Sequence, residues 1–158
     1  MNVTMRKGTP ADMGRVQEIV EEVWAIGADF AMEEKYGSVG SERWDRWLVP
    51  KVMSRIWDEI DSLLVTEVDG TVVGFITYSM SSQRSVGSIH YNGVCAAGRG
   101  LGIGTRQVQT VLETFRAAGM EYACVGTGLN EGHAPARHVY EKCGFEPLIE
   151  YVMYSQKL

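Results

Sequence analysis

Residues 94–105 read Val-Cys-Ala-Ala-Gly-Arg-Gly-Leu-Gly-Ile-Gly-Thr, with four glycines among the seven residues 98–104. A strand-like run at residues 87–95 enters this stretch, and apolar residues at helical spacing follow it. Glycine lets the backbone bend tightly and lets a ligand approach the main chain. The first turn of a helix presents N–H groups without intrahelical partners at the positive end of the helix dipole. The stretch therefore predicts a strand, a loop and a helix that together bind a phosphate or a pyrophosphate.

The glycine pattern excludes two common nucleotide sites. A Walker A loop ends in Gly-Lys-Ser/Thr, and residues 94–105 contain no lysine. The dinucleotide fingerprint G-x-G-x-x-G fails because its last position falls on Ile103 when counted from Gly98 and on Thr105 when counted from Gly100. A glycine-rich turn without a ligand is the alternative to a phosphate site of another kind.

The segments around the loop predict a single α/β domain over residues 1–158, since no repeat, low-complexity tract or linker interrupts them. Asp69-Gly70 lies between two strand-like runs and predicts a hairpin with a type I′ turn. Thr9-Pro10-Ala11-Asp12 has the residues of a helix start. Strands are expected at residues 2–6, 63–68, 71–78, 87–95, 122–125 and 149–154, and helices at about residues 9–24, 41–60, 105–118 and 133–143.

Composition excludes several classes of protein. The formal net charge of -5 is unfavourable for binding nucleic acid, which requires a basic surface. No window approaches the roughly 18 consecutive apolar residues of a membrane helix, and residues 1–9 lack the apolar core of a signal peptide. The three cysteines, Cys95, Cys124 and Cys143, do not have the spacing of metal ligands. We therefore expect a cytoplasmic protein with free thiols and no metal, nucleic-acid or membrane partner.

Two segments resemble motifs of one superfamily. Residues 99–104 are similar to the Q/R-x-x-G-x-G/A pyrophosphate loop of the GNAT acyltransferases, and residues 136–145, Ala-Arg-His-Val-Tyr-Glu-Lys-Cys-Gly-Phe, resemble their A-x-x-x-Y-E-K-x-G-F segment. The resemblance extends to the order of elements along the whole chain. It implies a mixed, mostly antiparallel sheet of six to seven strands, flanked by about four helices and splayed between the fourth and fifth strands. It also implies acetyl-coenzyme A (acetyl-CoA) as the acyl donor.

The resemblance assigns a set of residues to coenzyme A. Two departures from the family pattern affect this set: His133 stands where the family commonly has Asn, so Asn130 is an alternative, and Ala96 replaces a frequent proline. The residues that the resemblance implies for the cofactor come from the strand, the loop and the later helix: Val94, Cys95, Arg99, Gly100, Leu101, Gly102, Ile103, Gly104, Thr105, Asn130, His133, Ala136, Arg137 and Tyr140.

Acetyl transfer to an amine requires that the amine lose a proton. An alkyl ammonium has a pKa near ~10.4, so roughly one molecule in a thousand or fewer is neutral at pH 7. His90 is a candidate base because it lies four residues before Val94, on the same face of the strand unless a bulge at Gly93 reverses the alternation. Its position also resembles that of a catalytic histidine in the arylalkylamine branch of the family. A structural histidine, with a bound water as the base, is the alternative.

The resemblance gives Tyr140 the role of hydrogen-bonding to, or protonating, the coenzyme A sulfur as it leaves. A tyrosine hydroxyl with a pKa of about 10 is protonated at neutral pH, whereas a free thiol titrates near ~8.5. The family places the donor for the oxyanion on the strand, which here is the amide of Val94 or Cys95. The alternative for Tyr140 is a helix residue that packs in the core.

The acceptor site is expected in residues 27–60. Glu33 and Glu34 could attract a cationic amine there, or form a solvated charged stretch, and Asn92 could orient a water. The predicted reaction is direct transfer, in a ternary complex, of acetyl from acetyl-CoA to a primary amine of a small molecule, an amino acid or a peptide. The alternatives are a non-catalytic acyl-CoA sensor and the same fold acylating a protein lysine or using another acyl donor. Relatives that pair through their sheets suggest a homodimer.

Overall fold

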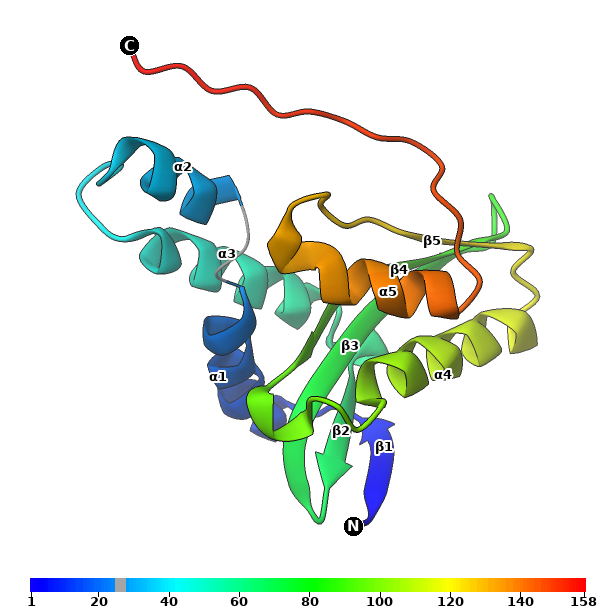
Figure 1. Ribbon diagram of the computed structural model, residues 1–158. Helices are drawn as coiled ribbons and strands as arrows, with labels where there is room; N and C mark the ends of the chain where they lie inside the picture. The colour runs from blue at the N-terminus through cyan, green and yellow to red at the C-terminus, as the bar shows by residue number, and fades with distance from the viewer. Residues whose placement is uncertain (25–27) are drawn as a thin grey trace.

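One mixed sheet organises the computed structural model, which describes residues 1–24 and 28–158 (Figure 1). Residue 27, the start of the expected acceptor segment, lies outside the described residues. The sheet has the strand order β1-β2-β3-β4-β5; β4 and β5 are parallel and the other neighbours antiparallel. The elements are β1 (Val3–Lys7), α1 (Met13–Val23), α2 (Ala28–Tyr36), α3 (Trp44–Asp58), β2 (Leu64–Val68), β3 (Thr71–Ser81), β4 (Val86–Val94), α4 (Ile103–Ala117), β5 (Tyr122–Val125) and α5 (Ala134–Lys142).

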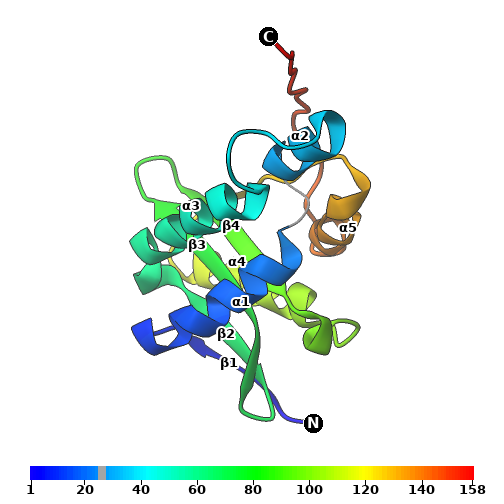
Figure 2. The ribbon, with the colours of Figure 1, turned by 90° about the vertical axis from the view of Figure 1, so that its left-hand side faces the viewer.

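Helices cover both faces of the sheet. α1 and α3 lie on one face, which Figure 2 turns toward the viewer, and α4 and α5 lie on the other (Figures 1 and 2). Two apolar clusters correspond to these faces, because each helix buries its apolar stripe against the strands. The first cluster packs α1 and α3 against β2 and β3, and the second packs α4 and α5 against β3 and β4.

The hairpin between β2 and β3 confirms the prediction from Asp69-Gly70. Both residues have positive φ, 48° at Asp69 and 82° at Gly70, as a type I′ turn requires. The start of α1 is also as predicted: Pro10–Asp12 form a 3-10 turn that leads into α1, and the amide of Thr9 donates to the carboxylate of Asp12.

The predicted numbers of strands and helices are wrong for the described residues. The sheet has five strands rather than six to seven, because residues 149–154 are extended and exposed and do not pair with another strand. The α-helices number five rather than about four, because α2 forms between the glycines of residues 27–40. The apolar residues of α2 do not follow helical spacing, so the pattern did not indicate it.

The sheet opens between β4 and β5. The parallel pairing joins Val86–Ile89 to Tyr122–Val125, while β4 continues alone to Val94. On its other edge β4 stays paired with β3, and the amide of Cys95 donates to the carbonyl of Val73 at 2.9 Å. Antiparallel pairs alternate in the direction of their main-chain groups. The N–H and C=O groups of Asn92 and Val94 therefore point away from β3, into the gap that β5 leaves.

Candidate active site

The glycine loop forms an open anion cradle. Gly100 and Gly102 have φ of 75° and 72°, a left-handed conformation that favours glycine, and no heavy atom lies within 4 Å of a Cβ built on either. Gly102 caps α4, and the first helical bond runs from the Arg106 amide to the Gly102 carbonyl. The amides of residues 103–105 therefore have no partner within the helix. Together with the positive end of the helix dipole, these amides can bind a phosphate.

Gly98 has a different function from the open glycines. It is buried, and a Cβ there would lie 2.7 Å from Cγ1 of Val94. Glu22 of α1 fixes the start of the loop, because its Oε1 accepts a 2.6 Å hydrogen bond from the amide of Ala96. The same carboxylate lies 3.7 Å from the guanidinium of Arg99, whose side chain is exposed. No motif in the sequence indicated Glu22.

Val94 and Cys95 are the two strand residues predicted to bind the cofactor. Of these, Val94 has main-chain N–H and C=O groups that do not pair with β3. Its N–H points into the gap between β4 and β5, as the register shows. The main-chain amide of Cys95 is hydrogen-bonded to the Val73 carbonyl of β3. Cys95 is 1% exposed, and its side chain lies beside Arg15. The oxyanion donor expected at Val94 or Cys95 is therefore available only at Val94.

Tyr140 and Asn92 meet at this gap. The Tyr140 hydroxyl donates a 2.9 Å hydrogen bond to Oδ1 of Asn92, and the tyrosine is 6% exposed. Burial raises the pKa of Tyr140 to about 12. The side chain is therefore protonated at neutral pH. The pair places an O–H donor beside the unpaired main chain of β4.

His90 lies on the opposite face from Asn92. Thr77 faces two residues of β4, His90 and Tyr91, and this bulge reverses the alternation that the sequence predicted. The bulge is thus at His90 rather than at Gly93. The hydroxyl of Thr77 accepts a 3.2 Å hydrogen bond from the Tyr91 amide and so satisfies the bulged main chain.

Three polar side chains line up on the face of α3. His90 Nε2 lies 2.7 Å from Ser79 Oγ, and His90 Nδ1 lies 3.6 Å from Oε1 of Glu59, the C-cap residue that follows α3. The second carboxylate oxygen of Glu59 is buried and has no hydrogen-bond partner in the described structure. The Ser79–His90–Glu59 row therefore places a hydroxyl at one ring nitrogen of His90 and a carboxylate near the other. The sequence did not indicate Glu59 or Ser79.

The residues expected near the second cofactor motif form one network. Asn130 and His133, the two alternatives from the sequence, are hydrogen-bonded to each other. Burial and the charge of Arg137 lower the pKa of His133. Arg137 donates to the carbonyls of Gly128 at 2.7 Å and Asn130 at 2.9 Å, so it holds the loop that follows β5. Ala136 packs in the second apolar cluster.

The predicted acceptor residues Glu33 and Glu34 lie on α2, which packs against α3. The charge of Glu33 contributes to a raised pKa of Arg43, and Glu34 is exposed. Cys95, Cys124 and Cys143 are free, as expected. No helix among the described residues is long and apolar enough to cross a membrane. Across residues 1–24 and 28–158 there is also no group of three His, Cys, Asp or Glu side chains arranged to hold a metal ion.

Comparison with known proteins identifies one family and several similar folds. The model of the acetyltransferase (GNAT) family matches residues 27–145. The PaiA N-acetyltransferase of Thermoplasma acidophilum, solved with coenzyme A, has a TM-score of 0.72 at 16% identity over 92% of this chain and 91% of its own. Ard1 of Thermoplasma volcanium has a TM-score of 0.66 at 24% identity, with coverages of 94% and 86%.

A third solved structure is the diaminobutyrate acetyltransferase EctA of Paenibacillus lautus, in complex with L-2,4-diaminobutyric acid and coenzyme A. Its TM-score is 0.63 at 15% identity over 90% of this chain and 74% of its own. No curated protein matches the chain. At these identities, the likeness to solved structures shows the fold.

Proposed function

Because the chain belongs to the acetyltransferase (GNAT) family and is therefore an acyltransferase, we propose that it transfers acetyl from acetyl-CoA to a primary amine of a small molecule, an amino acid or a peptide. The observation that carries the proposal is the meeting of three features at one gap in the sheet. These are the glycine cradle at the start of α4, the unpaired main chain of Val94 and the buried hydroxyl of Tyr140.

The residues present fit acetyl-CoA. The open faces of Gly100 and Gly102 leave room for a pyrophosphate beside the amides of residues 103–105. The carbonyl of Val94 offers an acceptor to an amide N–H of the pantetheine arm, and its N–H remains for the oxyanion. Coenzyme A in the PaiA and EctA structures supports this choice. Bound acetyl-CoA would supply the thioester whose acetyl group the amine receives by direct attack in a ternary complex.

Tyr140 and Val94 have separate parts in the proposed transfer. The amide of Val94 would donate to the developing oxyanion, where a positioned donor has its largest effect in a site that excludes water. Tyr140 keeps its proton because its pKa is about 12. Its hydroxyl would turn from Asn92 toward the leaving coenzyme A sulfur and donate a hydrogen bond to it.

His90 is the proposed acceptor of the amine's proton. One proton of the ammonium would pass to Nε2 of His90, and Glu59 would stabilise the imidazolium that results. The second proton, which the nitrogen loses after attack, would go to the coenzyme A sulfur as the C–S bond breaks, so that the products are the amide and the thiol. Ser79 already bonds Nε2, so its hydroxyl or a water would connect the amine to the ring. Glu33 and Glu34 of α2 and the net charge of -5 favour a cationic acceptor.

Calorimetric titration with acetyl-CoA tests the cofactor part of the proposal. The native chain should bind one equivalent, and Gly102→Trp should abolish binding by filling the cradle. Gly119→Trp is a matched control, since Gly119 also has positive φ (75°) and open space but follows the other end of α4. Equal loss in both variants, or no binding by the native chain, would contradict the proposal.

An amine panel then tests the reaction, with release of the coenzyme A thiol as the readout. Turnover with small amines supports the proposal. Binding of acetyl-CoA without turnover of any amine would favour the sensor. Turnover confined to protein lysines, or to another acyl donor, would identify the remaining alternatives.

A further inference from the structure

Two aromatic rings form a corner on the face of the sheet that α1 and α3 cover, the face that Figure 2 turns toward the viewer. Trp24, the C-cap residue of α1, and Tyr91 of β4 have ring centroids 6.0 Å apart, and their planes meet at 45°. Trp24 is also stacked on Phe75, at 6.1 Å and 18°, and Phe75 is fully buried. Trp24 and Tyr91 themselves are half-buried. The corner therefore combines two accessible aromatic residues with a rigid apolar base.

Gly93 brings this corner beside the gap between β4 and β5. A Cβ built on Gly93 would lie 3.3 Å from Cζ3 of Trp24, which is a tight contact, so the absence of a side chain lets the indole lie directly on β4. The next residue is Val94, whose N–H is the proposed oxyanion donor. His90, the proposed base, directly precedes Tyr91. An amine that attacks at Val94 from this face would carry its substituents past the two rings.

The corner offers apolar surface rather than a free charge. Burial raises the pKa of Tyr91 and the charge of Glu59 adds to the shift, so the phenol is neutral at neutral pH. One carboxylate oxygen of Glu59 lies near His90, and the other is buried. Glu22, two residues before Trp24, is hydrogen-bonded to the cofactor loop. Both carboxylates are therefore already engaged in other contacts.

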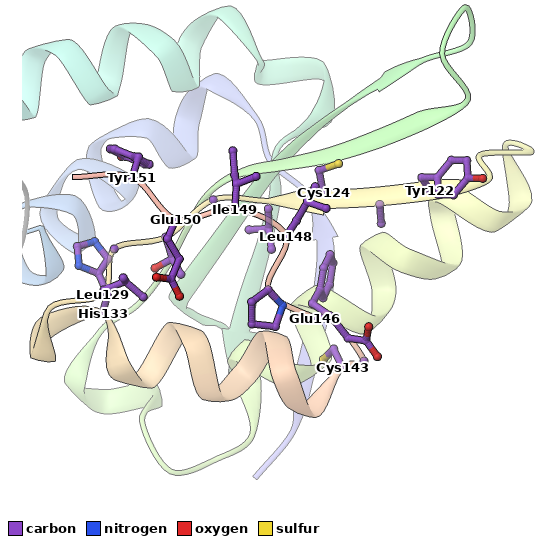
Figure 3. Close-up of a pocket in the computed structure, with 18 of the residues that line it drawn as sticks. Tyr122, Cys124, Leu129, His133, Cys143, Glu146, Leu148, Ile149, Glu150 and Tyr151 are labelled. Atoms are coloured by element: carbon purple, nitrogen blue, oxygen red, sulfur yellow. The ribbon is translucent and has the colours of Figure 1, made fainter. Parts of the chain in front are cut away.

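A separate cavity of about 1570 Å³ lies between β5 and residues 146–153 (Figure 3). Figure 3 shows Tyr122 and Cys124 on the β5 flank and Ile149 on the other. The residues that line this cavity include neither ring of the corner nor Val94. The cavity and the corner are therefore distinct apolar surfaces, and variants can separate them.

We propose that the corner of Trp24 and Tyr91 binds an apolar side chain of the acceptor. The substrate is then a primary amine that carries an aliphatic or aromatic group, such as an amino acid derivative or a peptide whose first residue is apolar. The side chain loses contact with water against the rings while the nitrogen faces Val94 and His90. This inference rests on the proposed function, because it requires that the amine attack from the α1 face.

Two acceptors of the same size test the inference. Leucinamide and asparaginamide both carry a primary amine, and their side chains have nearly equal shape, one apolar and one polar. We expect the native chain to acetylate leucinamide with a kcat/KM roughly 10- to 100-fold higher, since a small change of apolar surface in a pocket has an effect of this order. In Trp24→Ala the ratio of the two kcat/KM values should fall about tenfold. Trp24→Phe keeps an aromatic ring and should stay closer to the native ratio.

The ratio is a robust readout. An unfolded fraction of a variant lowers the rate with both amides equally, and the different basicity of the two amines cancels when the ratio is compared between proteins. Trp57→Ala is the matched control, because Trp57 is 45% exposed on α3, and it should retain the native ratio. Ile149→Ala examines the cavity and should also retain it.

Four results would overturn the inference and leave the proposed function in place. The first is turnover of amines without a preference for leucinamide. The second is an unchanged ratio in Trp24→Ala, and the third is a fall of the ratio in Ile149→Ala alone. The fourth is a preference for lysinamide over leucinamide, which would assign the rings to a second cation. If the native chain binds acetyl-CoA and acetylates no primary amine, the proposed function fails, and the inference fails with it.

Discussion

The hydroxyl of Tyr140 lies 2.9 Å from the amide oxygen of Asn92, and this hydrogen bond joins α5 to the half of β4 that β5 does not cover. The two residues are 48 positions apart in the chain. The hydrogen bond therefore depends on the parallel β4–β5 pairing and on the packing of α5 over it. The hydrogen bond keeps the protonated hydroxyl of Tyr140 at the gap between β4 and β5, where the main-chain N–H and C=O groups of Val94 point away from β3.

Removal of this hydroxyl should slow acetyl transfer and leave cofactor binding intact. We expect Tyr140→Phe to lower kcat roughly 100-fold, within the range that a positioned acid contributes. The dissociation constant for acetyl-CoA should change little. Steady-state kinetics and calorimetry measure the two quantities separately.

Tyr78→Phe is the matched control, because Tyr78 is a buried tyrosine of the same apolar cluster. It should retain the native kcat. An equal loss in both variants would indicate a packing effect and contradict a catalytic part for Tyr140.

The raised pKa of Tyr140 predicts a loss of stability in alkali. The unfolded tyrosine ionises near 10 and the folded one near 12, so the unfolded state loses its proton first and stability falls as pH rises above about 10. Between about pH 9 and pH 11 the native chain should lose about 1.3 kcal/mol more than Tyr140→Phe. Urea unfolding of both proteins at the two pH values measures this difference. Parallel curves would show that the hydroxyl is not buried in solution.

Asp12 should stabilise the fold at neutral pH and not in acid. Arg6 donates to its two oxygens at 2.9 and 2.8 Å, and this contact holds the pKa of Asp12 well below its usual range. The contribution is therefore present above the unfolded pKa of about 3.9 and is lost as pH falls below it. We expect Asp12→Asn to cost about 2 kcal/mol at neutral pH. The difference should shrink in acid, because Asp12 of the unfolded chain takes up a proton at a higher pH than Asp12 of the folded chain, and this favours unfolding of the native protein.

The matched control is Asp45→Asn, which breaks an exposed pair with Arg43 and should change stability little. Urea unfolding at neutral and acidic pH measures both variants. A cost of Asp12→Asn that did not depend on pH would contradict the assignment to the charge of Asp12.

The sequence predicted the features that depend on local chemistry. Asp69 and Gly70 determine their turn through their own φ angles, and the glycines of residues 98–104 determine the cradle in the same way. Tyr140 could be singled out as a candidate because the residues of its motif are neighbours in the chain, most of them in α5. In each case the decisive residues are neighbours in the chain, so their spacing carries the information.

Features that depend on distant contacts were missed. The bulge that turns His90 toward α3 depends on Thr77 of another strand, and Glu59 reaches His90 only because α3 ends beside β4. Residues 149–154 have the composition of a strand, but a strand also needs a neighbour, and the described chain provides none for them. No spacing within one segment encodes these relationships.

Glu59 is expected to act through His90 as a positioning residue. Its Oε1 lies 3.6 Å from Nδ1 of His90, and its other oxygen is buried without a partner, so Glu59→Gln removes a negative charge that stabilises the imidazolium. We expect kcat to fall roughly 10-fold, because a positioned base contributes about 100-fold or more in total. Asp58→Asn, an exposed carboxylate one residue earlier, should leave kcat unchanged. A kcat of Glu59→Gln equal to the native value would remove His90 and Glu59 from the proposed proton path and leave a bound water as the base.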